Sequence, residues 1–217
     1  MVEKSDTQLN GDVVEELNID PTIQSDRISI AVHDGSVTLT GSVPSYWQKL
    51  HAEKAIKRVI GVRALADDLK VELPGSHVRD DSDIAAAAAS ALRWHSDLPD
   101  SVKATVRNGW ITLTGEVKWH FQRDTAEEAV HHIKGAYGVL NEIELQPNPH
   151  PVDVRKAIKA ELERTVDRDA NKVDIETTDG HVKLTGSVRS WLEDSAVRRA
   201  SWSVPGVTEV EDLLVIR

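Results

Sequence analysis

Two histidines and two acids, spaced along one segment, form the clearest group of residues that could do chemistry. His120, Asp124, Glu127 and His131 recur every three or four residues, so a helix would present them on one face. Imidazole and carboxylate groups in that arrangement can bind a transition metal, but a solvated, charged helix face has the same composition. The corresponding repeat segment, residues 46–57, has Tyr, Leu, Glu and Lys at these positions. We therefore predict a solvated face and no metal site.

Other signatures of catalysis or ligand binding are missing from the sequence. The chain has no cysteine, which excludes disulfides, thiolate catalysis and cysteine-ligated metals. It has neither a GxSxG nucleophile motif nor a phosphate-binding GxxxxGK[ST] loop. The acidic segments DDSD (80–83) and DRDANKVD (167–174) lack the glycine and glutamate of a calcium-binding loop. We predict no catalytic residue, no cofactor and no bound metal.

The charge and hydropathy of the chain limit the classes of partner and the cellular compartments that we expect for it. Its 217 residues include 36 acids and 26 Lys or Arg, a net charge of −10. Because nucleic-acid binding depends on clustered basic residues, we expect no nucleic-acid partner. No stretch reaches about 18 consecutive apolar residues, and the N-terminus lacks a signal-peptide pattern. As written, the sequence is expected to be soluble and cytoplasmic, or periplasmic if a signal segment has been removed.

Nine of the 12 glycines repeat on a fixed grid. They stand at positions 35, 41 and 61, then 109, 115 and 135, then 180, 186 and 206. Within each set the spacings are six and 20 residues, and the sets are offset by 74 and then 71 residues. Such regularity indicates a tandem array. We predict three domains, residues 1–74, 75–147 and 148–217, referred to below as repeats 1, 2 and 3.

The segment around the first two glycines of each repeat predicts a β-hairpin. It reads HDGSVTLTGSV at 33–43, RNGWITLTGEV at 107–117 and TDGHVKLTGSV at 178–188. Asp-Gly and Asn-Gly favour the type I′ turn, and alternate flanking residues are apolar, so each strand has one buried and one polar face. The second glycine lies in the buried phase, which predicts a bend or the close approach of a helix.

A helix is predicted before each hairpin. Helix-forming patterns run from Leu9 to Leu17, over 82–94 and over 151–165. Ser82 or Asp83 is the expected N-cap of the second of these helices.

A second helix, with a stripe of alanines, is predicted after each hairpin and should end at the third glycine of the repeat. Short third strands are then expected at Leu69–Val71, Ile143–Leu145 and Leu214–Ile216. The predicted fold class is α+β: three tandem α-β-β-α-β two-layer sandwiches, each with a three-stranded mixed sheet and two helices on one face.

This repeat resembles the BON domain, named after bacterial OsmY and nodulation proteins. The resemblance rests on a G-x-V-x-L-x-G-x-V core at 35–43 and 180–188, followed in both repeats by a Gly-Val pair before the last strand. Repeat 2 has a similar core at 109–117 but Gly135-Ala136 in place of that pair. The family often has Asn shortly before the last strand, and the residues there are Asp67, Asn141 and Asp212. The chain is thus similar to OsmY-like proteins with tandem copies.

The resemblance implies a non-enzymatic protein associated with phospholipid membranes and with osmotic or other envelope stress. Aromatic rings favour the membrane–water interface, so we predict lipid contacts near the start of each second helix. The candidates are Tyr46, Trp47, Trp119, Phe121 and Trp191. Three weak contacts in one chain would reinforce one another. Alternatively, each ring covers its own small core, as Trp119 does if it continues the apolar stripe of its helix.

Two other surfaces suggest a protein partner. Trp110 lies on the polar-face phase of its strand, where the other repeats have Ser36 and His181, so packing between domains or a partner surface should cover it. Leu213 and Val215 make the outer side of the last strand apolar, which predicts a protein partner or self-association through domain 3. The alternatives to lipid binding are therefore a soluble interaction scaffold and an ion-responsive binding module.

Overall fold

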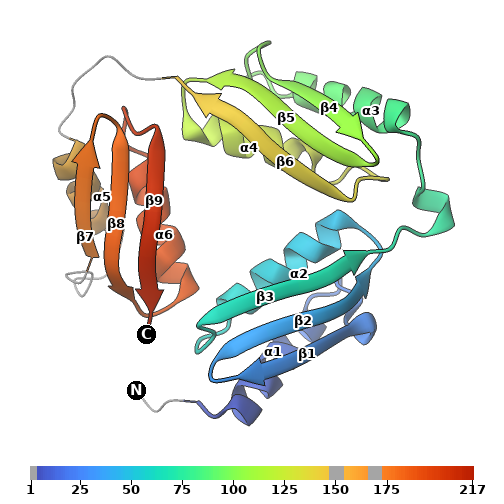
Figure 1. Ribbon diagram of the computed structural model, residues 1–217, viewed down its shortest axis with the longest axis horizontal. Coiled ribbons are helices and arrows are strands. Elements are labelled where there is room, and N and C mark those ends of the chain that lie inside the picture. The colour runs from blue at the N-terminus through green and yellow to red at the C-terminus, as the bar shows by residue number, and fades with distance from the viewer. Residues whose placement is uncertain (1–3, 147–153, 166–172) are drawn as a thin grey trace. The chain divides into compact units, whose positions relative to one another are not determined.

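The computed structural model describes residues 4–146, 154–165 and 173–217 and contains three α-β-β-α-β repeats (Figure 1). The chain divides into two compact units, one of residues 1–117 with 121–144 and one of residues 118–120 with 145–217. Repeat 1 and most of repeat 2 therefore lie in the first unit, whereas residues 118–120 of repeat 2 belong to the second. The predicted fold class is confirmed, with three separate three-stranded sheets.

The element order is the same in every repeat. Repeat 1 consists of α1 (Asp6–Ile19), β1 (Ile28–His33), β2 (Ser36–Val43), α2 (Tyr46–Arg58) and β3 (Ala64–Val71). Repeat 2 consists of α3 (Asp81–Trp94), β4 (Lys103–Arg107), β5 (Trp110–Val117), α4 (His120–Val130) and β6 (Gly138–Leu145). Repeat 3 consists of α5 (Val154–Thr165), β7 (Val173–Thr178), β8 (His181–Val188), α6 (Trp191–Trp202) and β9 (Glu209–Ile216).

Each sheet has the hairpin's second strand at its centre. In repeat 1, β1 runs antiparallel to β2, with Val32 opposite Val37, and β3 runs parallel to β2, with Val71 beside Val43. Both helices cover one face of the sheet (Figure 1). The core lies between the helices and the sheet, and its largest side chains, such as Leu17, Leu39 and Ile56, are fully buried. The other face of the sheet carries the polar phase of the strands and lies open.

The hairpin turns have the predicted conformation. Asp34 and Gly35 have φ of 47° and 75°, the positive values that a type I′ turn requires. The second glycine, Gly41, also has positive φ, 118°, and a Cβ there would lie 2.1 Å from the carbonyl oxygen of Arg27. The close approach is thus made by the backbone that enters the first strand. Arg27 is the last residue of a short 3-10 helix, Ser25–Arg27, so the predicted close approach occurs but comes from this turn and not from either α-helix of the repeat.

A carboxylate at the start of the first helix holds the hairpin turn, a contact that the sequence pattern did not reveal. Asp6 accepts hydrogen bonds from the backbone N–H groups of Asp34 and Gly35, at 2.9 and 3.2 Å. These bonds lower the pKa of Asp6 below its usual value. Asp81 holds the turn of repeat 2 in the same way, through Asn108 and Gly109. Each contact joins α1 or α3 to its own sheet.

Three predicted boundaries need correction. The N-cap of α3 is Asp80, not Ser82 or Asp83. The second helices end before the third glycine, at Arg58, Val130 and Trp202. The glycines follow in short turns, with φ of 108°, 97° and 100°, because the chain must reverse there to enter the last strand. That strand is longer than expected in all three repeats, and in repeats 1 and 3 it pairs with the full length of the central strand.

The longer third strands place the Asp and Asn residues inside the strands rather than before them. Their side-chain oxygens accept the backbone N–H two residues ahead: Asp67 from Leu69 (3.0 Å), Asn141 from Ile143 (3.3 Å) and Asp212 from Leu214 (3.0 Å). In repeat 1 the backbone N–H of Glu72 donates a hydrogen bond to the carbonyl oxygen of Val43 on β2, so it points toward the central strand. N–H groups alternate in direction along a strand, so the N–H of Leu69 points to the free edge. A polar side chain therefore occupies the edge that another strand would need.

Candidate functional site

In repeats 1 and 2, the loop after the first helix is hydrogen-bonded to the start of the second helix. In repeat 1, Gln24 N–H donates to Gln48 Oε1 at 3.1 Å. In repeat 2, Gln122 Nε2 donates to the carbonyl oxygen of Asp97 at 2.6 Å. The same backbone arrangement therefore occurs in both repeats, and the side chains that it carries can be compared position by position.

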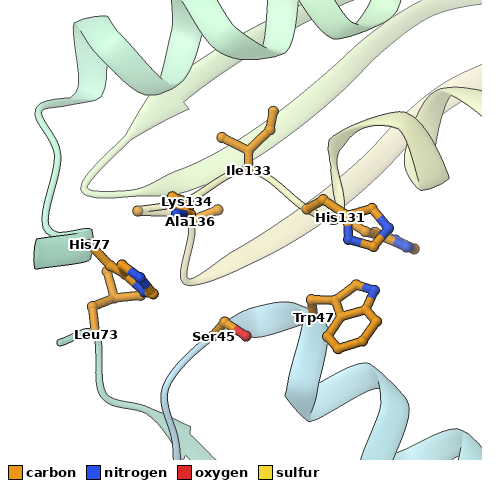
Figure 2. Close-up of a pocket in the computed structure, with 10 residues that line it drawn as sticks. Ser45, Trp47, Leu73, His77, His131, Ile133, Lys134 and Ala136 are labelled. Atoms are coloured by element: carbon orange, nitrogen blue, oxygen red, sulfur yellow. The ribbon is translucent and has the colours of Figure 1, made fainter. Parts of the chain in front are cut away.

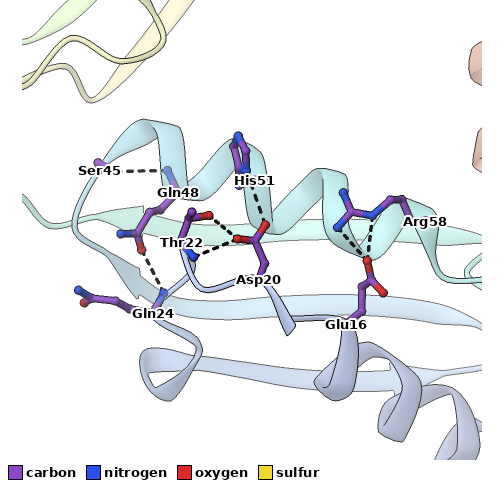
Figure 3. Close-up of polar contacts among 8 residues, drawn as sticks. All are labelled: Glu16, Asp20, Thr22, Gln24, Ser45, Gln48, His51 and Arg58. Atoms are coloured by element: carbon purple, nitrogen blue, oxygen red, sulfur yellow. Dashed lines mark hydrogen bonds and ion pairs between the residues drawn. The ribbon is translucent and has the colours of Figure 1, made fainter. Parts of the chain in front are cut away.

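In repeat 1 this end is polar (Figure 3). Asp20 accepts hydrogen bonds from the N–H and the hydroxyl of Thr22, and His51 Nδ1 lies 3.7 Å from its other oxygen. The Thr22 bonds are the main reason that the pKa of Asp20 is lowered. Ser45 caps α2 by accepting the N–H of Gln48 at 3.2 Å. We refer to Asp20, Thr22, Ser45, Gln48 and His51 as the polar end of repeat 1.

Tyr46 and Trp47, two of the predicted lipid contacts, lie where repeat 1 meets repeat 2. The Tyr46 ring stands edge-on to His131, with centroids 5.8 Å apart. Trp47 lies 3.8 Å from the ring of His51 and 5.4 Å from that of His132. Burial is the main cause of the raised pKa of Tyr46, with the negative charge of Glu127 contributing. Both rings are half-buried.

Trp47 also lines a pocket of about 180 Å³ between the two repeats (Figure 2). Ser45, His77, His131 and Lys134 contribute polar atoms to its wall. The pocket is smaller than the roughly 300–1,000 Å³ of ordinary small-molecule sites. We interpret it as a packing gap of the joint.

In repeat 2 the same end is aromatic. Trp94, Trp119 and Phe121 are 85%, 42% and 53% exposed. Aligned by the offset of 74, Trp94 replaces Asp20, Trp119 replaces Ser45 and Phe121 replaces Trp47. We refer to these three residues as the aromatic end of repeat 2. Large rings are expensive to leave in water, so the exposed rings of Trp94 and Phe121 indicate a contact surface.

Two features of the aromatic end differ from the sequence-based expectation. Trp119 precedes α4 and is exposed, so its assignment to the apolar stripe was wrong; the buried residues of that helix are Ala126 and Val130. Trp94 was not identified as a candidate. Its helix buries Ile84, Ala88 and Leu92, and this spacing of four already places Trp94 off the buried face.

The corresponding residues of repeat 3 differ again. Trp191, the first residue of α6, is half-buried. Leu192, which aligns with Phe121, is 72% exposed. Repeat 3 therefore presents one large apolar side chain where repeat 2 presents an aromatic group.

Of the four regularly spaced histidines and acids in and next to α4, His131 and Glu127 form a structural contact, whereas the His120 ring stacks on that of Trp202, with centroids 3.9 Å apart. His131 Nε2 lies 3.4 Å from Glu127 Oε1, and Asn141 Nδ2 donates to Glu127 Oε2 at 2.9 Å. The His131 contact is the largest cause of the lowered pKa of Glu127. The acid thus ties α4 to β6. Across the described ranges, no group of three or more His, Cys, Asp or Glu is placed to hold a metal ion.

Comparison with known proteins identifies the repeat. The BON domain matches residues 5–72, 80–147 and 152–217. The chain belongs to the BON domain family. The members of this family are generally non-enzymatic, and the family's role is associated with stress or with membrane binding. No curated protein matches the chain as a whole. In the part of the chain that the structure describes, no helix is long and apolar enough to span a bilayer.

Among solved structures, the chain is similar to CdsD, a structural protein of the type III secretion system of Chlamydia trachomatis. The CdsD C-terminal domain has 15% identity and a TM-score of 0.28, with 99% of this chain and 100% of that chain covered. A second CdsD structure has 16% identity and a TM-score of 0.26, with 97% and 92% covered. At these scores the likeness carries no functional information.

Proposed function

We propose that this tandem BON-domain protein is a non-catalytic, stress-associated protein that binds phospholipid membrane surfaces through the aromatic end of repeat 2. The observation that carries the proposal is the exposure of the Trp94 and Phe121 side chains, 85% and 53%, in repeat 2. The equivalent positions of repeat 1 hold Asp20 and the half-buried Trp47. The exposed rings are therefore a property of one repeat and not of the fold.

Aromatic rings suit this role because they combine an apolar body with a preference for the headgroup region. Arg93 is exposed beside Trp94 in the sequence and can approach lipid phosphates. The net charge of −10 works against a general attraction to anionic membranes. Binding should therefore depend on ring burial and should resist salt.

The expected affinity is modest. Full burial of one large apolar side chain contributes about 1.5–3 kcal/mol, and rings at an interface are buried only in part. Leu192 of repeat 3 offers a second weak contact in the same chain, and linked contacts raise the apparent affinity when both reach the surface. We therefore place the main contact in repeat 2 and an auxiliary one in repeat 3.

Vesicle flotation tests this function. The protein is mixed with phosphatidylcholine vesicles, or with vesicles that also contain phosphatidylglycerol, at low salt and at high salt. The proposal expects flotation on both vesicle types, a blue shift of tryptophan emission and little loss at high salt. Flotation only on anionic vesicles at low salt would contradict the aromatic mechanism, and no flotation under any condition would contradict lipid binding.

A matched pair of variants tests the location of the contact. Trp94→Ser with Phe121→Ser removes two rings of the aromatic end. Ile19→Ser with Ile60→Ser removes two apolar side chains of similar exposure, 68% and 64%, from repeat 1. Only the first variant should lose flotation. Equal losses in both would mean that general surface hydrophobicity, and not the aromatic end, drives binding.

A further inference from the structure

The outer face of the repeat 2 sheet is built differently from the other two outer faces. Trp110 on β5 lies across Gly138 on β6, where a Cβ would stand only 2.3 Å from the indole ring. Glycine is therefore needed for the ring to lie over the neighbouring strand. The ring remains exposed, as does Leu140 two residues along β6. In repeats 1 and 3 the same pair of positions is Ser36 with Ala64 and His181 with Glu209.

This face also separates its charges. On the outer side of β4 lie the exposed bases Lys103 and Arg107, and on the outer side of β6 lie the exposed acids Glu142 and Glu144. The central strand β5 stands between these two strands. Lys103 is level with Thr114, and Arg107 is level with Trp110. The face thus has a basic margin on β4 and an acidic margin on β6, with Trp110, Thr112, Thr114 and Glu116 between them on β5.

We propose that this face binds the same face of a second copy of the chain. A two-fold axis parallel to β5 turns the second sheet over and exchanges its margins, so that the basic β4 of one copy faces the acidic β6 of the other. Sheets pack about 10 Å apart, a distance that large side chains such as Trp110 and Leu140 fill. Lys103 then approaches Glu142 of the second copy.

The same operation gives Trp110 a partner. Because its ring leans toward β6, the two-fold axis places the ring of the second copy toward β4, where Arg107 lies. A guanidinium over an indole face is a favourable cation–π pair. Each interaction occurs twice, as a closed two-fold interface requires.

The other outer faces do not complement themselves. In repeat 3 the outer side of β9 carries Glu209 and Glu211, which lie beside His181 and Lys183 of β8. It also carries the exposed Leu213 and Val215, which the sequence indicated as a partner surface. The same two-fold operation would place Glu176 of β7 opposite Glu211 and Asp174 opposite Leu213, so it brings like charges together and pairs an acid with an apolar side chain.

In repeat 1 the face carries mainly small or polar side chains such as Ser29, Ala31 and Ala66. At the edge formed by the last strand of each repeat, strand pairing is opposed by the inward Asp or Asn side chain. We therefore assign the dimer interface to the outer face of repeat 2. This proposal does not depend on the proposed lipid contact.

Sedimentation velocity from about 5 µM to about 500 µM, a range that covers weak self-association, tests the proposal. The intact chain should show a monomer–dimer equilibrium. Lys103→Glu and Glu142→Lys should each weaken the dimer by about tenfold or more, since each places like charges opposite one another. The two changes together should restore the dimer, because the two-fold axis pairs them. Trp110→Ser with Leu140→Ser should leave a monomer.

The matched control is Lys70→Glu, which changes the charge of an exposed residue on the outer face of repeat 1. It should not alter the equilibrium. A chain that stays monomeric over the whole range would overturn the proposal. So would a double charge exchange that is no better than the single changes, or a dimer that survives the loss of Trp110 and Leu140.

Discussion

Repeats 1 and 2 have the same backbone arrangement at one end, but the side chains there are polar in repeat 1 and aromatic in repeat 2. Repeat 1 fills this end with Asp20, Thr22 and His51 and covers Trp47 against a histidine of the next repeat. Repeat 2 fills it with Trp94 and Phe121, both exposed. The fold therefore tolerates either a polar or an aromatic surface at this end. The reason is that the glycine-containing turns and the buried apolar residues of the helices and strands, and not the residues at this end, determine the backbone.

The comparison also separates two roles for one aligned position. Trp47 and Phe121 both follow the N-cap region of a second helix. Trp47 is part of a joint between two repeats, whereas Phe121 is 53% exposed. A pattern of bulky residues in a repeat protein can therefore mark a joint in one copy and a contact surface in another.

Trp47→Ala should produce the largest effect, a loss of about 2 kcal/mol in the stability of the first unit, because a half-buried indole leaves a void between α2 and repeat 2. Phe121→Ala should change stability by less than about 0.5 kcal/mol, as exposed substitutions do. Urea unfolding followed by circular dichroism measures both. Equal costs at the two positions would contradict the distinction between joint and contact surface.

Trp94→Asp gives repeat 2 the residue that repeat 1 has at this position. We expect vesicle partitioning to fall about tenfold, since about 1.4 kcal/mol of ring burial is lost. Vesicle sedimentation across a range of lipid concentrations measures the partition coefficient. Trp94→Phe is the control and should retain most of the binding. An unchanged partition coefficient for Trp94→Asp would remove Trp94 from the site.

Asp20→Ala should give the smallest effect, a loss of about 1 kcal/mol at neutral pH from the missing Thr22 hydrogen bonds. The pKa of Asp20 is lowered in the folded protein from a usual value of 3.8. Its stabilisation is therefore complete well above pH 3.8 and is lost as the pH falls through the folded value. Thermal unfolding at pH 7 and near pH 3 should show the variant and the intact chain converging in acid. A difference that does not depend on pH would show that the carboxylate charge is not responsible.

Much of the fold could be predicted from the sequence because its strongest signals are local. Asp34-Gly35 specifies its turn through positive φ, and the alternation on both sides specifies a strand with one buried face. The ends of the second helices could not be predicted from the third glycine. Gly61 has positive φ because the chain reverses there, but a glycine in that conformation serves a helix end and a later turn equally well.

The candidate site was only partly predictable for a different reason. The aromatic residues near the start of the second helix were visible, but whether a ring is covered depends on a neighbouring repeat, as the contact of Trp47 with His132 shows. Trp94 comes from another helix and joins Phe121 only through the fold. The turn contact made by Asp6 spans 28 residues in the sequence, a separation that no local pattern signals.

The most direct test of the central claim uses the absence of cysteine from the chain. A single cysteine at Ser96→Cys, an exposed position two residues after Trp94, keeps all the rings; labelled with the environment-sensitive dye nitrobenzoxadiazole, it reports on the aromatic end, and one at Ile60→Cys reports on an exposed site of repeat 1. With phosphatidylcholine vesicles, the label at position 96 should brighten and shift to the blue, and the label at position 60 should not change. No response at position 96, or the same response at both positions, would contradict membrane contact through the aromatic end of repeat 2.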